Sequence, residues 1–174
     1  VHLRRQRQMC IRDRFITGGG SGIGASIVEH FCEQGSEVYF VDINLKETKK
    51  LLKKIKKNKF RAPIFIECNL LDINKLEKII RNIITQKGPI HALINNAAND
   101  DRHTTDEVDE KYWENRIAIN LKHYFFAAKA VVKSMKKMKA GSIVNLSSVS
   151  WMLGEGDKVV YELSLIHISE PTRR

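Results

Sequence analysis

The stretch Thr17-Gly18-Gly19-Gly20-Ser21-Gly22-Ile23-Gly24 governs the interpretation of this chain. It follows the apolar pair Phe15-Ile16 and precedes a helical pattern that runs from Gly22 to about Gln34. A glycine-rich turn between a strand and a helix offers bare backbone N–H groups to an anion, and the helix N-terminus favours negative charge. The sequence therefore predicts a binding site for the pyrophosphate of a dinucleotide.

Each glycine of this turn has a predicted task. Gly18 permits the bend, Gly22 lets the backbone approach the phosphates, and Gly24 lets the helix pack closely on the strand. Ser21 and Ile23 lie between these glycines and are predicted to contact the cofactor with them. Because glycines also form ordinary turns, the motif needs a second feature beside it.

That second feature is Asp42, which follows the β-type run Glu37–Val41 and lies 18 residues beyond Gly24. A carboxylate at this strand end can accept hydrogen bonds from the adenosine ribose hydroxyls, and it repels a 2′-phosphate. No arginine follows it directly, so we expect the cofactor to be NAD rather than NADP. The alternative is a surface aspartate that caps the next helix.

Short β-branched or aromatic runs alternate with longer helical patterns along the rest of the chain. This alternation predicts a doubly wound α/β fold with a Rossmann-type parallel sheet. Further strands are predicted at Pro63–Glu67, Ile90–Ile94 and Ser142–Leu146, and helices at Lys46–Lys59, Ile73–Thr85 and about Glu107–Met138, the last with a break near Asn115.

The composition places the chain among soluble globular proteins. Its 174 residues are 43% hydrophobic and 29% charged, as is usual for one domain with its own core. No apolar run is close to the length of about 20 residues that a bilayer-spanning helix needs. Three scattered cysteines suit neither a disulfide framework nor a zinc site, so we expect a cytoplasmic protein with no metal site and no membrane partner.

The two ends of the sequence look foreign to the rest. The segment Arg4–Arg14 resembles a conceptual translation of a transposase-type sequencing adapter, and Leu163–Arg173 resembles the opposite adapter. We therefore expect residues 1–14 and 163–174 to be assembly artefacts, and the natural domain to run from about Phe15 to Glu162. The alternative is a natural basic arm and tail, and the coding nucleotides would decide between the two.

A net charge of +10 also raises the class of nucleic-acid-binding proteins. Residues 1–14 contribute +4 and residues 163–174 contribute +1, so +5 remains for the core. Much of this remainder lies in Lys46–Lys59, where an apolar stripe at helical spacing leaves the lysines on the other faces. Such lysines usually coat a solvated helix, so we expect no nucleic-acid partner; an anion-binding patch is the alternative.

Several of these features together resemble the short-chain dehydrogenase/reductase family. They are the glycine turn, Asn95-Asn96-Ala97-Ala98 after the fourth strand, Asn120, Ser148 and Tyr161, and the resemblance spans Phe15–Glu162. It implies an oxidoreductase and further strands beyond Leu146, which are missing from this sequence.

The resemblance also implies cofactor contacts outside the glycine turn. In the family, the segment that matches Asn95–Ala98 lies beside the riboses, so Asn96, Ala97 and Ala98 are candidate contacts, although Ala98 replaces a usual glycine. The position of Asn69, which Leu70 follows, is commonly an aspartate that contacts adenine. Asparagine retains an acceptor oxygen, so we include both residues.

The catalytic residues follow from the family's spacing, because Ser148 lies 13 residues before Tyr161. The resemblance implies that Tyr161 exchanges a proton with the substrate oxygen, that Ser148 holds this oxygen and that Asn120 anchors a water in the proton relay. Ser147 and Ser150 lie nearby but miss the spacing.

One position departs from the family, which has a lysine four residues after the tyrosine where this chain has Leu165. A tyrosine side chain has a pKa of about 10, and the family's lysine lowers this value and binds the nicotinamide ribose. Leucine can do neither. Because Leu165 falls inside the adapter-like segment, we interpret the difference as truncation and expect this chain by itself to be inactive.

Three segments resemble a narrower group, the bacterial sugar 1-dehydrogenases that oxidise D-xylose and related aldoses. They are Asn96–His103, Tyr112–His123 and Ser148–Gly154. A hydroxyl-rich substrate requires polar groups around its pocket, so the candidate substrate contacts are Asn99, Arg102, His103 and Trp151. The alternative is that residues 100–103 form a salt-bridged loop that supports the site.

The sequence thus predicts an enzyme that transfers a hydride between NAD and a small alcohol or carbonyl substrate, with a sugar favoured. Family resemblance implies a homodimer or homotetramer. A 3-oxoacyl or other ketone reductase of the same family is the alternative among enzymes, and a non-catalytic dinucleotide-binding protein is the alternative of another class.

Overall fold

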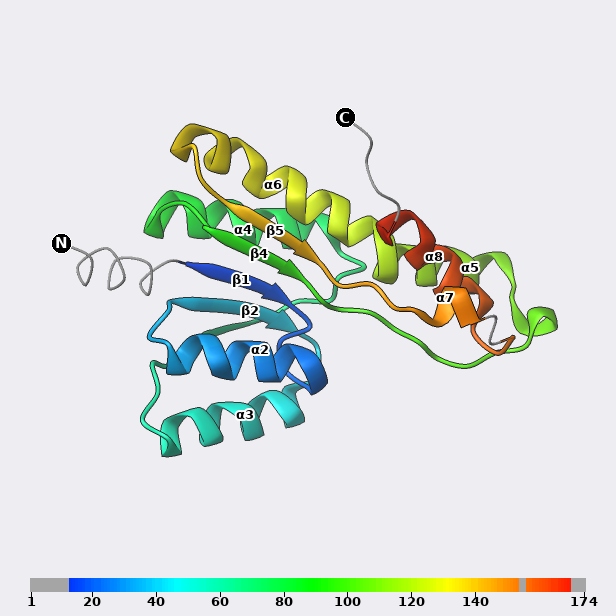
Figure 1. The fold of residues 1–174 in the computed structure, drawn as a ribbon, viewed down its shortest axis with the longest axis horizontal. Coiled ribbons are helices and arrows are strands. Elements are labelled where there is room, and N and C mark those ends of the chain that lie inside the picture. Colours follow the sequence, from blue (N-terminus) through cyan, green and yellow to red (C-terminus); the bar gives the residue numbers. More distant parts are fainter. Residues whose placement is uncertain (1–12, 154–155, 170–174) are drawn as a thin grey trace.

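The computed structural model describes residues 13–153 and 156–169 and shows a parallel sheet with helices on both faces (Figure 1). The strands lie in the order β3-β2-β1-β4-β5, and every neighbouring pair is parallel. Their bounds are β1 (Arg14–Thr17), β2 (Val38–Asp42), β3 (Ile64–Glu67), β4 (Ala92–Asn95) and β5 (Ser142–Asn145). The predicted doubly wound α/β fold is confirmed.

The helices that cover this sheet are α2 (Gly22–Glu33), α3 (Leu45–Lys57), α4 (Ile73–Lys87) and α6 (His123–Met138), and together with α5 (Glu110–Ile117) they follow the predicted segments closely. The shorter elements are η1 (Thr105–Glu107), η2 (Ala118–Lys122), α7 (Ser150–Leu153) and α8 (Val159–Ser169). The helices α5, α7 and α8 lie beyond the carboxyl ends of the strands (Figure 1), and the last two were not predicted from the sequence. Side-chain caps begin two of the long helices, because Asn44 accepts from the N–H of Glu47 and Asp72 accepts from that of Lys75.

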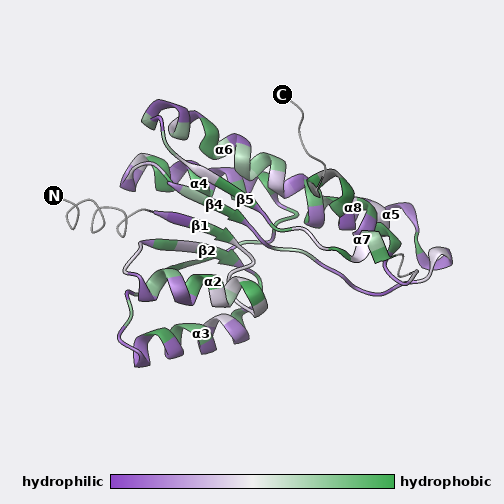
Figure 2. Ribbon diagram, viewed as in Figure 1, coloured by the Kyte–Doolittle hydropathy of each residue, from purple (hydrophilic) through white to green (hydrophobic). Residues whose placement is uncertain are grey.

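Alternation along the strands divides the core into two layers. Phe15 faces α4 and α6 in one apolar cluster, whereas its neighbour Ile16 faces α2 and α3 in the other. Tyr39 and Phe40 divide in the same way. Figure 2 shows hydrophobic residues concentrated in the strands and hydrophilic residues along α3, whose lysines lie outside the core.

The predicted long helix is interrupted, a few residues later than expected. The break is the π-helical turn η2, which lies between α5 and α6, whereas the sequence pattern placed it near Asn115. This turn buries Asn120 completely. A π turn inside a helix shifts the register of the side chains that follow and often occurs at functional sites.

Regular secondary structure crosses both of the expected domain boundaries, which lie at about Phe15 and Glu162. Residues 1–12 and 170–174 lie outside the described residues, whereas β1 already begins at Arg14 and α8 continues past Glu162 to Ser169. The assignment of both flanks as artefacts stays a prediction.

The strand β5 forms one edge of the sheet. Ile143 and Val144 remain 37% and 46% exposed, since β4 is the only strand of the described residues that pairs with β5. An apolar strand with a free edge is prone to association. Among the described residues no helix has the length and hydrophobicity that crossing a bilayer requires.

Candidate functional site

In the glycine turn between β1 and α2, the backbone at Gly18 packs closely against Gly24. Gly18 has φ +66°, and a Cβ on Gly24 would lie 1.9 Å from the Gly18 carbonyl oxygen, so no larger residue fits there. Gly22 also has a positive φ of +53°, but a Cβ on it would meet no atom within 4 Å. The turn therefore faces open space at Gly22, where a ligand can approach the backbone.

Asp42 holds the outer side of this turn. Its Oδ2 accepts from the N–H of Gly20 at 2.7 Å, and its Oδ1 accepts from the N–H of Asn44 at 2.7 Å. Each carboxylate oxygen has a second acceptor site, which leaves two for ribose hydroxyls. Asn44, not Asp42, is the side chain that caps α3, so the capping alternative for Asp42 is wrong.

Asn96 binds the end of β4 to the same turn. Its Nδ2 donates to the carbonyl oxygens of Thr17 at 3.1 Å and of Gly18 at 2.9 Å. The neighbouring Ala97 packs against Gly18, because a Cβ on that glycine would lie 2.8 Å from the Ala97 Cα. The carboxyl ends of β1 and β4 therefore form one surface, which we call the cofactor floor and which consists of Thr17, Gly18, Asn96 and Ala97. Open α/β sheets bind ligands at this position.

The end of β3 completes this side of the site with Cys68, Asn69 and Leu70. The Oδ1 atom of Asn69 accepts from the N–H of Leu71 at 3.0 Å, so this acceptor already has a partner within its own loop. Leu70 is nearly buried, and Cys68 is fully buried. Burial raises the pKa of the Cys68 thiol, so it remains a neutral apolar part of the wall.

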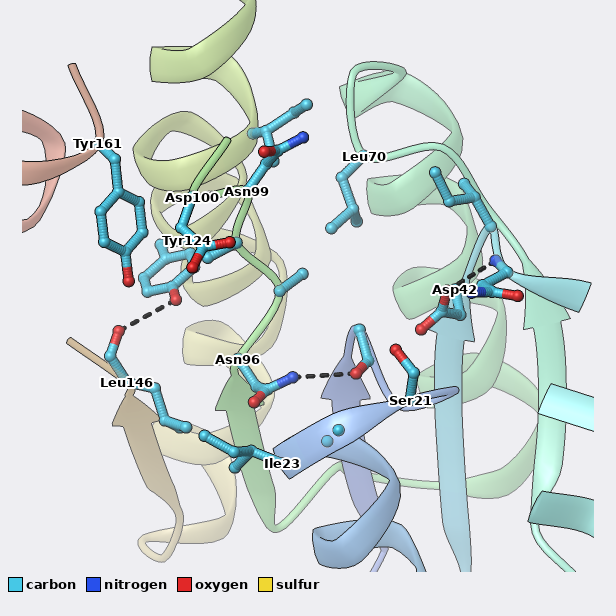
Figure 3. Close-up of a pocket in the computed structure, with 18 of the residues that line it drawn as sticks. Ser21, Ile23, Asp42, Leu70, Asn96, Asn99, Asp100, Tyr124, Leu146 and Tyr161 are labelled. Atoms are coloured by element: carbon cyan, nitrogen blue, oxygen red, sulfur yellow. Dashed lines mark hydrogen bonds between the residues drawn. The ribbon is translucent and has the colours of Figure 1, made fainter. Parts of the chain in front are cut away.

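These strand ends open onto a cavity of about 650 Å³ (Figure 3). The volume is in the range of small-molecule and cofactor sites. Every predicted cofactor contact lines it; these are Gly18, Ser21, Gly22, Ile23, Gly24, Asp42, Asn69, Leu70, Asn96, Ala97 and Ala98. The residues present therefore fit a dinucleotide, with open backbone for phosphates at Gly22 and an anchored carboxylate for a ribose at Asp42.

The structure brings only part of the predicted catalytic set to this cavity. Tyr161 and Leu165 line it together, since they are four residues apart on α8 and share a helix face. Ser148 does not line it; its Oγ lies 3.0 Å from that of Ser150 and accepts from the Ser150 N–H. Of Ser147, Ser148 and Ser150 after β5, Ser147 lines the cavity, although it misses the spacing to Tyr161 that the family shows.

Asn120 acts on the backbone of the loop after β4. Its Oδ1 accepts from the Asn99 N–H at 2.7 Å, and its Nδ2 donates to the Asn99 carbonyl oxygen at 3.1 Å. Both ends of the buried amide are therefore used within the protein. Asn120 thereby fixes Asn99, which itself lines the cavity, and its predicted role as the anchor of a water stays a prediction.

The polar run Asn99–His103 divides between the cavity and its support. Asn99 and Asp100 line the cavity, whereas Arg102 is 75% exposed and forms an ion pair with Asp157. His103 is buried away from the cavity, with Nδ1 2.9 Å from the Tyr112 hydroxyl.

These contacts favour the supporting-loop interpretation for residues 101–103. Asp101 pairs with Arg116 at 2.8 Å, and the His103 N–H donates to the Asp157 carbonyl oxygen at 2.7 Å. Trp151 lies in α7, also outside the residues that line the cavity. Of the four candidate substrate contacts, the structure thus brings only Asn99 to the cavity.

Besides Ser147, sequence reasoning missed the cavity-lining side chains of Tyr124 and Asp100. Tyr124 is nearly buried, and its hydroxyl donates to the Leu146 carbonyl oxygen at 3.1 Å; burial raises its pKa, so the phenol stays neutral (Figure 3). The carboxylate of Asp100 has no hydrogen-bond or ion-pair partner among the described residues (Figure 3). A signal for Asp100 was its place in the polar run; Tyr124 lies in an apolar helical pattern that reveals no such role.

The comparison with protein-family models assigns the chain to a class. The model of the short chain dehydrogenases matches residues 14–164, so the chain belongs to the short-chain dehydrogenase family. Among the described residues no group of three or more His, Cys, Asp and Glu side chains could hold a metal ion.

Two relatives within the family are named as sugar dehydrogenases. The chain is similar to D-xylose 1-dehydrogenase of Caulobacter vibrioides, with 39% identity over 158 residues, which cover 91% of this chain and 62% of that protein. It is also similar to a probable galactose dehydrogenase of Rhizobium meliloti, with 39% identity over 145 residues, 82% of this chain and 57% of the relative. The chain spans about three fifths of the length of these relatives.

The fold is likewise similar to solved structures. An actinorhodin polyketide ketoreductase variant crystallised with NADPH superposes with a TM-score of 0.82 at 24% identity, covering 91% of this chain and 61% of that one. At that identity the likeness shows the fold and leaves the choice of cofactor and substrate open.

Proposed function

We propose that this chain carries the cofactor-binding half of an NAD-dependent oxidoreductase that converts an alcohol and a carbonyl compound into each other. The observation that carries the proposal is a shared cavity: the glycine turn and Asp42 line it together with Tyr161. A fold that only stored a dinucleotide would have no need of a phenol in the same cavity.

The proposed roles follow from the position of each group. A bound nicotinamide dinucleotide would supply the hydride acceptor. The backbone around Gly22 would bind the pyrophosphate, and Asp42 would accept from the ribose hydroxyls while its charge opposes a 2′-phosphate. Tyr161 would take the proton that leaves the substrate hydroxyl.

A sugar is the proposed substrate class. The cavity wall after β4 offers the backbone-anchored Asn99 and the carboxylate of Asp100, and carboxylates accept hydrogen bonds from neighbouring hydroxyl groups. The named activities of the xylose and galactose relatives favour the same class. A 3-oxoacyl substrate offers no such row of hydroxyls to Asp100.

Leu165 provides the sharpest test of the proposed chemistry. It shares the cavity face of α8 with Tyr161, so a lysine there would bring a positive charge to the phenol. We expect Leu165→Lys to raise the rate of NADH formation with D-xylose or D-galactose by about 100-fold over the unchanged chain. Leu165→Met, which matches the size without the charge, should remain inactive.

The outcomes separate the candidate functions. If Leu165→Lys binds NAD but reduces none with any aldose or secondary alcohol, the proposed activity is wrong. The alternative, a non-catalytic dinucleotide-binding protein, would show that result. Oxidation of a 3-hydroxyacyl compound in preference to every aldose would instead identify a ketone reductase.

The substrate assignment has its own pair of matched variants. In the Leu165→Lys background, Asp100→Asn should raise the KM for the aldose about tenfold and leave the Kd for NAD unchanged. Asp101→Asn removes an equal charge one residue along, from a side chain that pairs with Arg116, and should leave the aldose KM unchanged. Equal effects of the two variants would refute a direct contact at Asp100.

A further inference from the structure

A buried histidine lies beneath the cofactor floor. His123 is the first residue of α6, directly after the π turn η2, and it is fully buried. Its Nε2 lies 3.3 Å from the hydroxyl oxygen of Thr17, the last residue of β1. Neither residue lines the cavity, so any role of this pair must act through its neighbours.

The Thr17 hydroxyl binds two backbone groups of the floor. Its oxygen accepts from the N–H of Asn96 at 3.0 Å and from the N–H of Ala97 at 3.1 Å. A hydroxyl oxygen has two acceptor sites and one proton. With both acceptor sites used by N–H donors, the proton of Thr17 must point to Nε2 of His123.

This proton count fixes the state of the imidazole. With Nε2 as the acceptor, the neutral ring carries its own proton on Nδ1, a buried atom that has no hydrogen-bond partner in the described part of the chain. Burial lowers the pKa of His123 to about 4, and the nearby backbone of Ile119 opposes that effect only in part. No charged side chain contributes to the shift, so the surroundings also favour the neutral ring.

The same helical stretch holds the floor at a second point. The π turn carries Asn120, whose amide grips the backbone of Asn99 from both sides. The segment from Asn96 to Asn99 is therefore fixed at its start through Thr17 and His123 and at its end through Asn120. The π turn allows both side chains to be buried beside this segment.

We propose that His123 is a positioning residue of the cofactor site, which acts as a neutral hydrogen-bond acceptor that orients the Thr17 hydroxyl and thereby fixes the N–H groups of Asn96 and Ala97. The proposal rests on the proposed function, because the segment that it fixes is the floor of the dinucleotide cavity.

The tautomer is tested on the unchanged chain without any ligand. Long-range ¹H–¹⁵N NMR correlations of His123 at neutral pH should show Nδ1 protonated and Nε2 unprotonated. A proton on Nε2, or on both nitrogens, would overturn the proposal. Because this measurement needs no cofactor, its result is independent of whether the chain binds NAD.

Three variants test the effect on the cofactor. His123→Leu removes the acceptor and should weaken NAD binding about tenfold, whereas His123→Gln retains an acceptor oxygen and should stay within about threefold of the unchanged chain. In a Thr17→Val background the hydroxyl is absent, so His123→Leu should weaken binding no further.

The competing outcomes are distinct. Equal weakening by His123→Gln and His123→Leu, or additive losses with Thr17→Val, would show that the ring matters only for packing and would refute the proposal. If His123→Leu does not fold, the comparison of His123→Gln with the Thr17→Val single variant decides, since only the second should lose affinity. If the unchanged chain binds no NAD, the proposed function fails while the tautomer result still stands.

Discussion

The two ends of the cavity differ in how their polar groups are held. At the dinucleotide end, the hydrogen bonds of Asp42 and Asn96 fix the glycine turn from two neighbouring strands. At the end that carries Tyr161, the hydroxyl of Ser148 is paired with Ser150, and β5 is exposed along its length. One end is organised for a ligand, whereas at the other the Ser148 hydroxyl is bound to Ser150 and does not line the cavity.

This difference follows from the elements that hold each end of the cavity. The glycine turn is held by Asp42 at the end of β2 and by Asn96 at the end of β4, and both of these strands pair directly with β1. The far end depends on the relative positions of β5, α7 and α8. The helix α8 packs mainly on α5 and on the π turn. Substitutions at the dinucleotide end should therefore lower stability and NAD affinity more than substitutions at the far end do.

Gly24→Ala should cause the largest loss, at the dinucleotide end. Its Cβ would lie 1.9 Å from the Gly18 carbonyl oxygen, which forces the turn apart at a cost of about 3 kcal/mol or more. We expect the free energy of unfolding in urea to fall by that amount and NAD affinity to fall by about 100-fold. Gly156→Ala meets no atom and is the matched control; equal losses in both would contradict a close-packed turn.

The stability of the chain at acid pH should depend on the group beneath that floor. Because the pKa of His123 is lowered to about 4 in the folded protein, its unfolded form binds more protons between about pH 6.5 and pH 4. Stability therefore falls by about 3 kcal/mol from this residue as the pH falls through that window. His123→Gln should abolish this component.

An opposing group makes the variant comparison necessary. Burial, with the charge of Glu37, raises the pKa of Asp13 to about 6, so this carboxyl contributes stability at low pH that is lost as the pH rises. The difference between the unchanged chain and His123→Gln, followed by urea unfolding from pH 7 to pH 4, isolates the histidine. An identical pH dependence in both proteins would rule out a buried neutral ring.

Tyr124→Phe should have a smaller effect, confined to the far end. It removes one hydrogen bond to the Leu146 carbonyl oxygen, at a cost of about 1 kcal/mol. Hydrogen exchange should become faster at the Leu146 N–H, which bonds to Asn95, and remain unchanged in β1. Faster exchange spread evenly over the sheet would mean that the two ends are not separable.

Arg102→Ala should have the smallest effect of all. The side chain is 75% exposed and its ion pair with Asp157 is screened by solvent, so stability should change by no more than about 0.5 kcal/mol. Affinity for NAD should be unaltered, because Arg102 does not line the cavity. A strong loss of aldose binding in this variant would return Arg102 to the substrate contacts.

The fold and the dinucleotide end were predictable because their signals are local. A strand, a glycine turn and a helix occupy consecutive residues, and Asp42 follows at the end of the next strand. The periodicity of α2 and α4 gave their bounds within two residues, since caps and glycines end them.

The division of the run Asn99–His103 could not be predicted. Which of its side chains enter the cavity depends on Arg116 and Asp157, which lie at least thirteen residues away in the sequence. The placement of Ser147 rather than Ser148 on the cavity wall likewise depends on the backbone direction after β5. The role of His123 depends on the π turn, and the sequence pattern indicated only a break near Asn115, not which side chains the turn would bury.

The central claim is that this cavity binds a dinucleotide with Asp42 at the adenosine ribose. The most direct test is the affinity of the unchanged chain for NAD and for NADP, measured by isothermal titration calorimetry. The claim predicts that NAD binds at least about tenfold more tightly than NADP, and that Asp42→Asn narrows this gap. Binding of neither dinucleotide, or tighter binding of NADP, would contradict it.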